Sequence, residues 1–197
     1  MKVVTLNPDG FERHCQLLAE RVAASYPDGF DAVVGIRRGG SVVCDAVCRH
    51  LSPLPPRRYD MSRQRSSTRR KGSWPAKFLR ALPYSVLNMM RMAESFLLAI
   101  RHGKESYSFT PVDIPQELRE SLKSGKCRRI LVVDDAIDSG ETILDIVESI
   151  RKVSSEVKII TAVITVTTRT PLLQPDFSIY DNRTLIRFPW SNDYKNH

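Results

Sequence analysis

The chain has few of the features that mark disulfide-rich, metal-binding or membrane proteins. Its 197 residues include four cysteines and no CxxC pair, which argues against a disulfide scaffold or a zinc site. Cys44 and Cys48 lie one helical turn apart, and we favour reduced, buried thiols over a metal pair there. No apolar run reaches the ~20 residues of a membrane-spanning helix. The first residues show no basic segment followed by an apolar stretch, so we expect no signal peptide and a cytoplasmic location.

The composition is sufficient for one hydrophobic core and carries an excess of positive charge. Hydrophobic residues make up 42% of the sequence, which fits one α/β domain over residues 1–197. The 30 Lys and Arg residues outnumber the 22 Asp and Glu residues, giving a net charge of +8. This excess favours polyanionic partners: nucleic acid, anionic lipid or phosphorylated small molecules. Charge alone does not choose among them.

Helical and strand patterns alternate along the chain. Helical spacing of apolar residues predicts helices at 9–26, 41–51 and 141–155. Apolar runs predict strands at 31–36, 128–135 and 158–166, with shorter ones at 177–180 and 185–188. Strands that alternate with helices at this spacing predict an α/β fold: a mostly parallel, twisted sheet flanked by helices and joined by right-handed crossovers.

The stretch "ILVVDDAIDSGET", residues 130–142, lies where the strongest predicted strand ends. Ligands of open α/β sheets bind beyond the carboxyl ends of the strands. Gly140 allows successive N–H groups to converge, and the helix start near Glu141 adds a partial positive charge, so the turn suits a phosphate. Ser139 and Thr142 can donate hydroxyl hydrogen bonds to the same anion. No GxxxxGK[ST] sequence occurs, which excludes a Walker phosphate loop.

Asp134 and Asp135 require a different ligand, because two carboxylates repel a phosphate. Carboxylates accept hydrogen bonds from sugar hydroxyls and hold Mg²⁺ directly or through water. The turn therefore favours a sugar and a phosphate in one molecule. The alternative is structural: Asp135 caps the following helix, and Asp134 pairs with Arg128 or Arg129.

The same stretch resembles the phosphoribosyl-pyrophosphate (PRPP) binding signature of type I phosphoribosyltransferases, with Ala136 where a larger aliphatic residue is usual. The resemblance implies a Mg²⁺-dependent enzyme that transfers ribose 5-phosphate from PRPP to a base and releases pyrophosphate. Asp134 and Asp135 would bind the ribose hydroxyls and hold Mg²⁺ through water. The 5-phosphate would bind to Asp138, Ser139, Gly140, Glu141 and Thr142.

The earlier stretch "FDAVVGIRRGGSVVCDAV" is similar to the family's pyrophosphate loop. Gly39 and Gly40 permit close approach of the backbone, and Arg37 or Arg38 can supply charge-assisted bonds to a diphosphate. The family often has a non-proline cis peptide bond here, so Arg37–Arg38 is the candidate. Taken alone, "RRGG" is also compatible with a tight surface turn.

Two further matches bear on the acceptor base. Members acting on 6-oxopurines carry an acid at the place of Asp138, which would handle a base proton; the alternative is that Asp138 caps the helix. "RTLIRFPW" is similar to the base-recognition segment of the xanthine/guanine branch, in a C-terminal hood at about 168–197. Leu185 stands where an aromatic residue is usual, Ile186 where backbone groups read the purine, and Arg169 near a basic residue that binds its O6.

Residues 53–125 match the family poorly and are interpreted as a basic loop and a helical insertion. The loop would close over the reacting centre and bring Ser66, Ser67, Arg69 and Arg70 to the pyrophosphate. The helical stretch 76–102 would cover the active site, form a dimer surface or touch a membrane peripherally. We expect a homodimer or larger homo-oligomer. Two rival hypotheses are a protein that binds PRPP or a nucleotide without catalysis, and a nucleic-acid binder acting through 57–71, which is the less favoured.

Overall fold

The computed structural model describes residues 2–55, 57–63, 82–90, 92–93, 107–181 and 184–195. Five parallel strands form the central sheet in the order β3-β2-β4-β5-β6. In chain order they are β2 (Ala32–Ile36), β3 (Arg58–Met61), β4 (Arg129–Ile137), β5 (Lys158–Val166) and β6 (Phe177–Tyr180). The predicted α/β class with a parallel sheet is confirmed.

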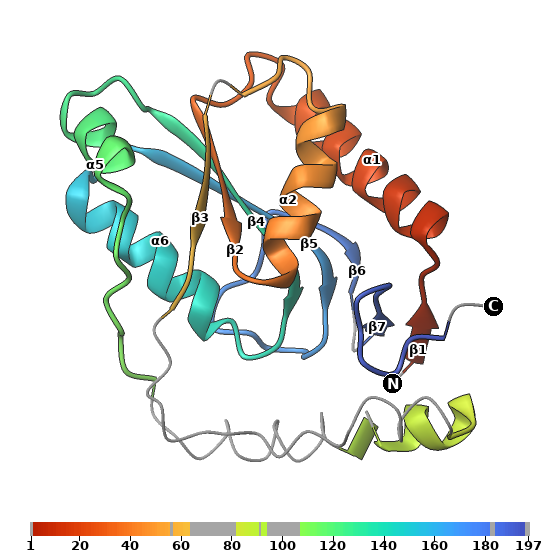
Figure 1. Cartoon of the computed structure of the whole chain (residues 1–197). Helices are drawn as coiled ribbons and strands as arrows, with labels where there is room; N and C mark the ends of the chain where they lie inside the picture. The colour runs from red at the N-terminus through yellow and green to blue at the C-terminus, as the bar shows by residue number, and fades with distance from the viewer. Residues whose placement is uncertain are drawn as a thin grey trace.

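Helices cover both faces of this sheet (Figure 1). On one face lie α1 (Pro8–Ser25) and α2 (Gly39–His50), and on the other lie α5 (Gln116–Lys123) and α6 (Glu141–Val153). The central strands are buried on both sides, which is why they read as continuous apolar runs rather than as alternating patterns.

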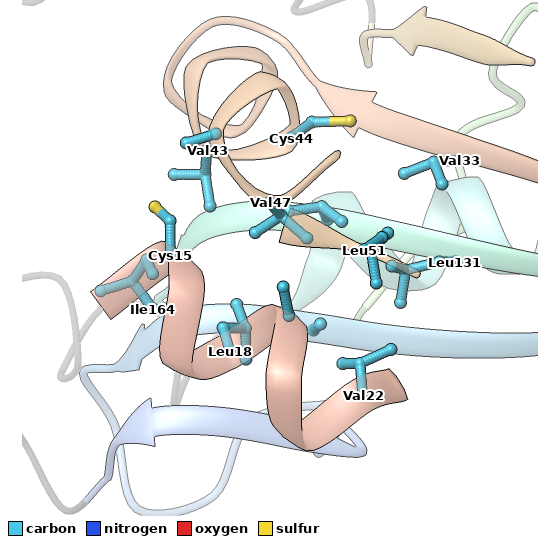
Figure 2. Packing of buried hydrophobic residues seen from close by; sticks show 14 of the residues in the cluster. Cys15, Leu18, Val22, Val33, Val43, Cys44, Val47, Leu51, Leu131 and Ile164 are labelled. Atoms are coloured by element: carbon cyan, nitrogen blue, oxygen red, sulfur yellow. The ribbon is translucent and has the colours of Figure 1, made fainter. Parts of the chain in front are cut away.

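The core between α1, α2 and the sheet is shown in Figure 2. Leu18 and Val22 of α1 and Val47 of α2 are fully buried and pack against alternate side chains of β2 and β4, such as Leu131. The start of α1 is fixed by Asn7, whose side-chain oxygen accepts a hydrogen bond of 2.8 Å from the Gly10 N–H. The packing sets α2, and with it the loop that precedes α2, firmly against the sheet.

A second, two-stranded parallel sheet pairs β1 (Lys2–Thr5) with β7 (Thr184–Arg187). It joins the central sheet through Thr165 of β5, whose hydroxyl donates a 2.6 Å hydrogen bond to the Thr184 carbonyl. The sequence patterns predict β7 but not β1, because four residues with only two apolar side chains show no usable period. The N-terminal strand thus completes the C-terminal hood.

The predicted insertion, 53–125, and the predicted C-terminal hood, 168–197, each contain elements that belong to the central sheet or to its helical layer. The range 53–125 includes β3 and α5, which belong to the central sheet and to its helical layer: Leu118 and Leu122 of α5 are buried in the second core cluster. The range 168–197 includes β6, a strand of the central sheet. Of the predicted helix 76–102, the described residues 84–90 are helical and begin after Pro83, and much of the rest lies outside the described residues.

The order of the strands fixes where a ligand can bind. After β2 the chain moves to β3 on one side, whereas β4 lies on the other side of β2. The loops after β2 and β4 lead into α2 and α6 on opposite faces. Ligands of open α/β sheets bind at such a reversal of the strand order, beyond the carboxyl ends of the strands. Residues 37–40 and 134–142 occupy this switch point. In the described part of the chain, no helix is long and apolar enough to cross a membrane.

Candidate functional site

The two loops at the switch point touch each other through glycines. A Cβ on Gly40 would lie 2.6 Å from Oδ1 and 2.8 Å from the Cα of Asp134, and a Cβ on Gly39 would overlap the carboxylate of Asp135. Only glycine therefore allows this approach. The predicted cis peptide bond between Arg37 and Arg38 is present, and both arginine side chains are exposed. The loop is thus more than an isolated surface turn, because it packs on the acid pair.

The acid pair lies at the end of β4 in a buried setting. Asp134 is 9% exposed, and its Oδ1 accepts a 2.8 Å hydrogen bond from the Asp135 N–H. Burial raises the pKa of Asp134 well above its ordinary value, and the neighbouring charge of Asp135 raises it further. Burial also raises the pKa of Asp135. Two carboxylates that ionise at such cost favour a cation or hydroxyl donors beside them.

The structural alternative for these acids is wrong. The Arg129 guanidinium donates to the Gly29 carbonyl at 3.0 Å, and that of Arg128 donates to the Gly125 carbonyl at 3.2 Å. The N-cap of α6 is Gly140, and the Glu141 N–H at the start of this helix donates to the Ser139 hydroxyl at 3.4 Å, so Asp135 does not cap it.

Gly140 shapes the turn that leads into α6. Its φ is +84°, in the left-handed region that favours glycine, and a Cβ there would lie 3.0 Å from the backbone nitrogen of Leu173. The Leu172 N–H donates a 2.8 Å hydrogen bond to the Ser139 carbonyl, so the segment after β5 packs against the turn and stabilises it. The Glu141 N–H donates a 3.4 Å hydrogen bond to the Ser139 hydroxyl, and the N–H groups that follow it belong to a helix start of the kind that suits an anion.

Asp138 is held by a residue that the sequence analysis missed. Its exposed side chain accepts a 2.6 Å hydrogen bond from the hydroxyl of buried Thr167, whose own N–H donates to the Ile137 carbonyl at 2.9 Å. The alternative that Asp138 caps α6 is wrong, since the N-cap of that helix is Gly140, the Glu141 N–H donates to Ser139, and the Asp138 carboxylate accepts from Thr167 instead. The one available signal is position: Thr167 directly follows β5, the strand that neighbours β4.

Arg63, a second missed residue, pairs with the start of α6. Its Nη1 lies 2.6 Å from Oε2 of Glu141, and its Nε lies 2.7 Å from Oδ2 of Asp145. Arg63 follows β3 directly, 78 positions before Glu141. The loop residues Ser66, Ser67, Arg69 and Arg70, predicted to reach the pyrophosphate, lie outside the described residues.

The candidate base-binding residues are spread over two segments. Leu185 and Ile186 lie in β7 and are buried, and the Ile186 side chain joins the core on the α1 side of the sheet. Trp190 of the Pro-Trp pair stacks on Phe188 with ring centroids 4.7 Å apart, so it belongs to the hood's own packing. Arg169 is exposed in the segment that follows β5.

The donor set limits how a metal could be held. Among the described residues, no group of three or more His, Cys, Asp and Glu side chains is arranged to bind a metal ion. Asp134 and Asp135 are two hard oxygen donors, which fits a Mg²⁺ ion that takes its other ligands from water and substrate.

The fold is an α/β sheet whose switch point carries an acid pair, a glycine-rich loop with two arginines and the start of a helix. The sequence matches the family described as "Phosphoribosyl transferase domain" over residues 6–196, and the chain belongs to this family. Membership supports phosphoribosyl transfer as the class of reaction. No curated protein sequence matches the chain.

Solved structures share the fold at low sequence identity. A purine phosphoribosyltransferase from Pyrococcus horikoshii Ot3 is 17% identical with a TM-score of 0.60, over 100% of this chain and 99% of that one. A Helicobacter pylori xanthine-guanine-hypoxanthine phosphoribosyltransferase is 14% identical with a TM-score of 0.58, over 95% and 92%. A hypothetical protein from Neisseria gonorrhoeae with bound ppGpp is 15% identical with a TM-score of 0.54, over 96% and 89%. The fold is that of type I phosphoribosyltransferases.

Proposed function

We propose that the protein transfers ribose 5-phosphate from PRPP to a purine-like base, with Mg²⁺, and releases pyrophosphate. The observation that carries this proposal is the contact of Gly39 and Gly40 with the carboxylates of Asp135 and Asp134 at the switch point. This contact places a cationic, glycine-rich loop beside an acid pair, so that one ligand could bind to the loop and to the acids at the same time. The purine-active neighbours support this class of acceptor.

Each loop takes one part of PRPP in this proposal. The turn 138–142 binds the 5-phosphate through backbone N–H groups at the start of α6 and through the hydroxyls of Ser139 and Thr142. Asp134 and Asp135 accept hydrogen bonds from the ribose hydroxyls. Residues 37–40 bind the pyrophosphate, with Arg37 and Arg38 as its charged partners.

The reaction breaks the bond from ribose C1′ to pyrophosphate and forms one from C1′ to a base nitrogen. The protein contributes position and charge: the arginines balance the charge that builds up on the leaving pyrophosphate, and the turn holds the sugar in line. Bound Mg²⁺ would supply charge neutralisation of the diphosphate, with Asp134 and Asp135 holding it through water.

In this proposal the acceptor base is bound by Asp138 and by residues of the C-terminal hood. Asp138 takes the proton that the base nitrogen loses, and the Thr167 hydroxyl keeps the carboxylate in place. Leu185 packs on the base, the Ile186 backbone reads its edge, and Arg169 supplies a positive charge near an exocyclic oxygen. An aliphatic residue at Leu185 packs on a ring without aromatic stacking, so a base bound there is held largely by polar contacts.

Pyrophosphate release tests this proposal. The protein is incubated with PRPP, Mg²⁺ and single bases: xanthine, guanine, hypoxanthine, adenine and uracil. We expect release with at least one 6-oxopurine, and loss of release on chelation of Mg²⁺. Asp138→Asn should slow turnover about 100-fold or more while PRPP still binds. Asp113→Asn, which changes an exposed carboxylate in a surface ion pair, is the matched control.

A binding protein without catalysis is the second candidate. The neighbour from Neisseria gonorrhoeae has bound ppGpp, a phosphorylated nucleotide, and this observation favours a protein that binds a nucleotide without transfer. Binding of PRPP or ppGpp, with no pyrophosphate released from PRPP in the presence of any of the bases, would support this candidate over transfer. We also propose a homodimer or larger homo-oligomer, which light scattering of the purified protein tests.

A further inference from the structure

The first two turns of α6 bring two carboxylates to the same side of the helix. Glu141 is the first residue of α6, and Asp145 follows four positions later. Side chains at this spacing are neighbours, and like charges there destabilise a helix. Asp145 is also fully buried, so its charge requires compensation from the protein.

Arg63 bridges these two carboxylates with separate nitrogens. Nη1 lies 2.6 Å from Glu141 and Nε lies 2.7 Å from Asp145, while Nη2 donates a 3.1 Å hydrogen bond to the Thr110 hydroxyl. The planar fork of a guanidinium can span two acceptors in this way, whereas the single ammonium of lysine cannot.

The other oxygen of Asp145 is also occupied. Its Oδ1 accepts hydrogen bonds from the Tyr107 hydroxyl at 2.7 Å and from the Thr110 N–H at 3.0 Å. Burial, together with this hydrogen bond, raises the pKa of Tyr107 to about 12, so Tyr107 stays a donor at neutral pH. Asp145 is therefore held in place independently of Arg63, and the main task left to Arg63 is charge.

Glu141 lies within the turn to which the proposed function assigns the 5-phosphate. A phosphate dianion would approach the N–H groups of α6 beside the Glu141 carboxylate and one turn from Asp145. Two uncompensated negative charges there would oppose the attraction of the helix start. We propose that Arg63 is a positioning residue for the 5-phosphate: its single positive charge offsets one of the two negative charges of Glu141 and Asp145 and so keeps the start of α6 able to bind a phosphate dianion. This inference rests on the proposed function.

The test measures binding of ribose 5-phosphate and of PRPP by calorimetry, together with steady-state kinetics. For Arg63→Gln we expect about tenfold weaker binding of both ligands and a matching rise in the KM for PRPP, with kcat changed less than about twofold. The double variant Arg63→Gln with Glu141→Gln should recover most of the affinity, because it removes the repelling charge and keeps the backbone N–H. Arg151→Gln removes an exposed ion pair further along α6 and serves as control.

Several outcomes would overturn the inference. Unchanged affinity in Arg63→Gln would do so, and so would weak binding that Glu141→Gln fails to restore while the melting temperature falls, since this indicates a structural role alone. If Arg63→Gln does not fold, the single variant Glu141→Gln decides, because it removes one negative charge and keeps the backbone N–H: tighter binding of ribose 5-phosphate than in the wild type supports the inference, and unchanged or weaker binding overturns it.

The design separates this inference from the proposed function. A wild-type protein that binds ribose 5-phosphate in an Arg63-dependent way, yet releases no pyrophosphate from PRPP, retains the inference and loses the transfer reaction. A wild-type protein that binds neither ligand contradicts both.

Discussion

At the scale of single residues, Thr167 is the group whose contact with Asp138 most directly affects the proposed chemistry. Its hydroxyl lies 2.6 Å from one carboxylate oxygen and fixes the direction in which the other can reach a base. Thr167→Val keeps the shape and removes the donor. We expect kcat to fall about tenfold with an unchanged KM for PRPP, because Asp138 is then less well oriented. Thr167→Ser should retain near wild-type turnover, and equal rates in all three proteins would contradict this role.

Asp135 shows the cost of keeping carboxylates in the site. Burial raises its pKa in the folded state, so ionisation at neutral pH lowers stability, and this cost vanishes below the unfolded pKa of about 4. We expect Asp135→Asn to raise the melting temperature of the ligand-free protein at pH 7 by about 2–4 °C per kcal/mol recovered. The gain should disappear as the pH falls toward 4, and PRPP binding should be lost. Thermal unfolding from pH 4 to 8 measures it, and a gain that does not depend on pH would contradict the explanation.

The site residues that belong to one sequence motif could be predicted, whereas the residues that make contacts between motifs could not. Asp134 and Asp135 lie near the carboxyl end of β4 and Gly140 follows that strand, so local pattern and sheet geometry place them at one edge. Arg63 meets Glu141 across 78 positions, and Thr167 meets Asp138 across 29. These contacts depend on which strands become neighbours, and one sequence does not determine that order.

At the scale of elements, the clearest predictions were the strands and helices with long apolar patterns. The predicted strand 158–166 coincides with β5, and α6 begins at the predicted Glu141. By contrast, β1 and α5 went unpredicted. Residues of α5 such as Leu118 and Leu122 are four positions apart on a short, mostly charged helix, and packing against the sheet rather than pattern length stabilises it.

The helix α2 also presents a pair of cysteines with different environments. Cys44 is fully buried, whereas Cys48, one turn later, is only half-buried. A hydrogen bond from Cys44 and the nearby charge of Arg58 lower the pKa of Cys48, while burial raises the pKa of Cys15 to about 12 and that of Cys127 to about 11.

We therefore expect iodoacetamide at neutral pH to alkylate Cys48 well before the other three cysteines. Mass spectrometry of peptides from the folded protein measures the order of modification. Cys48→Ser should leave the protein almost unmodified over the same time, and denaturation should make all remaining thiols react. Equal modification of Cys15 or Cys127 in the folded protein would contradict the assignment.

At the scale of the whole molecule, Arg187 joins segments from both ends of the chain. This buried β7 residue donates hydrogen bonds to Asp193 at 2.9 Å, to Thr5 of β1 at 2.9 Å and to Asn88 at 2.8 Å. Its guanidinium also lies 4.5 Å from the centre of the Tyr84 ring. The small β1–β7 sheet, the C-terminal segment and the helical residues 84–90 thus all contact one charged side chain.

Arg187→Met should loosen these three segments together. Breaking a buried ion pair costs about 3–5 kcal/mol, so we expect a lower melting temperature. Hydrogen exchange should accelerate in residues 2–5 and 82–90 but not in β4 and β5, whose packing does not involve Arg187. The double variant Arg187→Met with Asp193→Asn should lose less stability, because no buried carboxylate is deprived of its cation. Exchange that rises equally throughout the central sheet would show instead that the hood and the central sheet unfold as one unit.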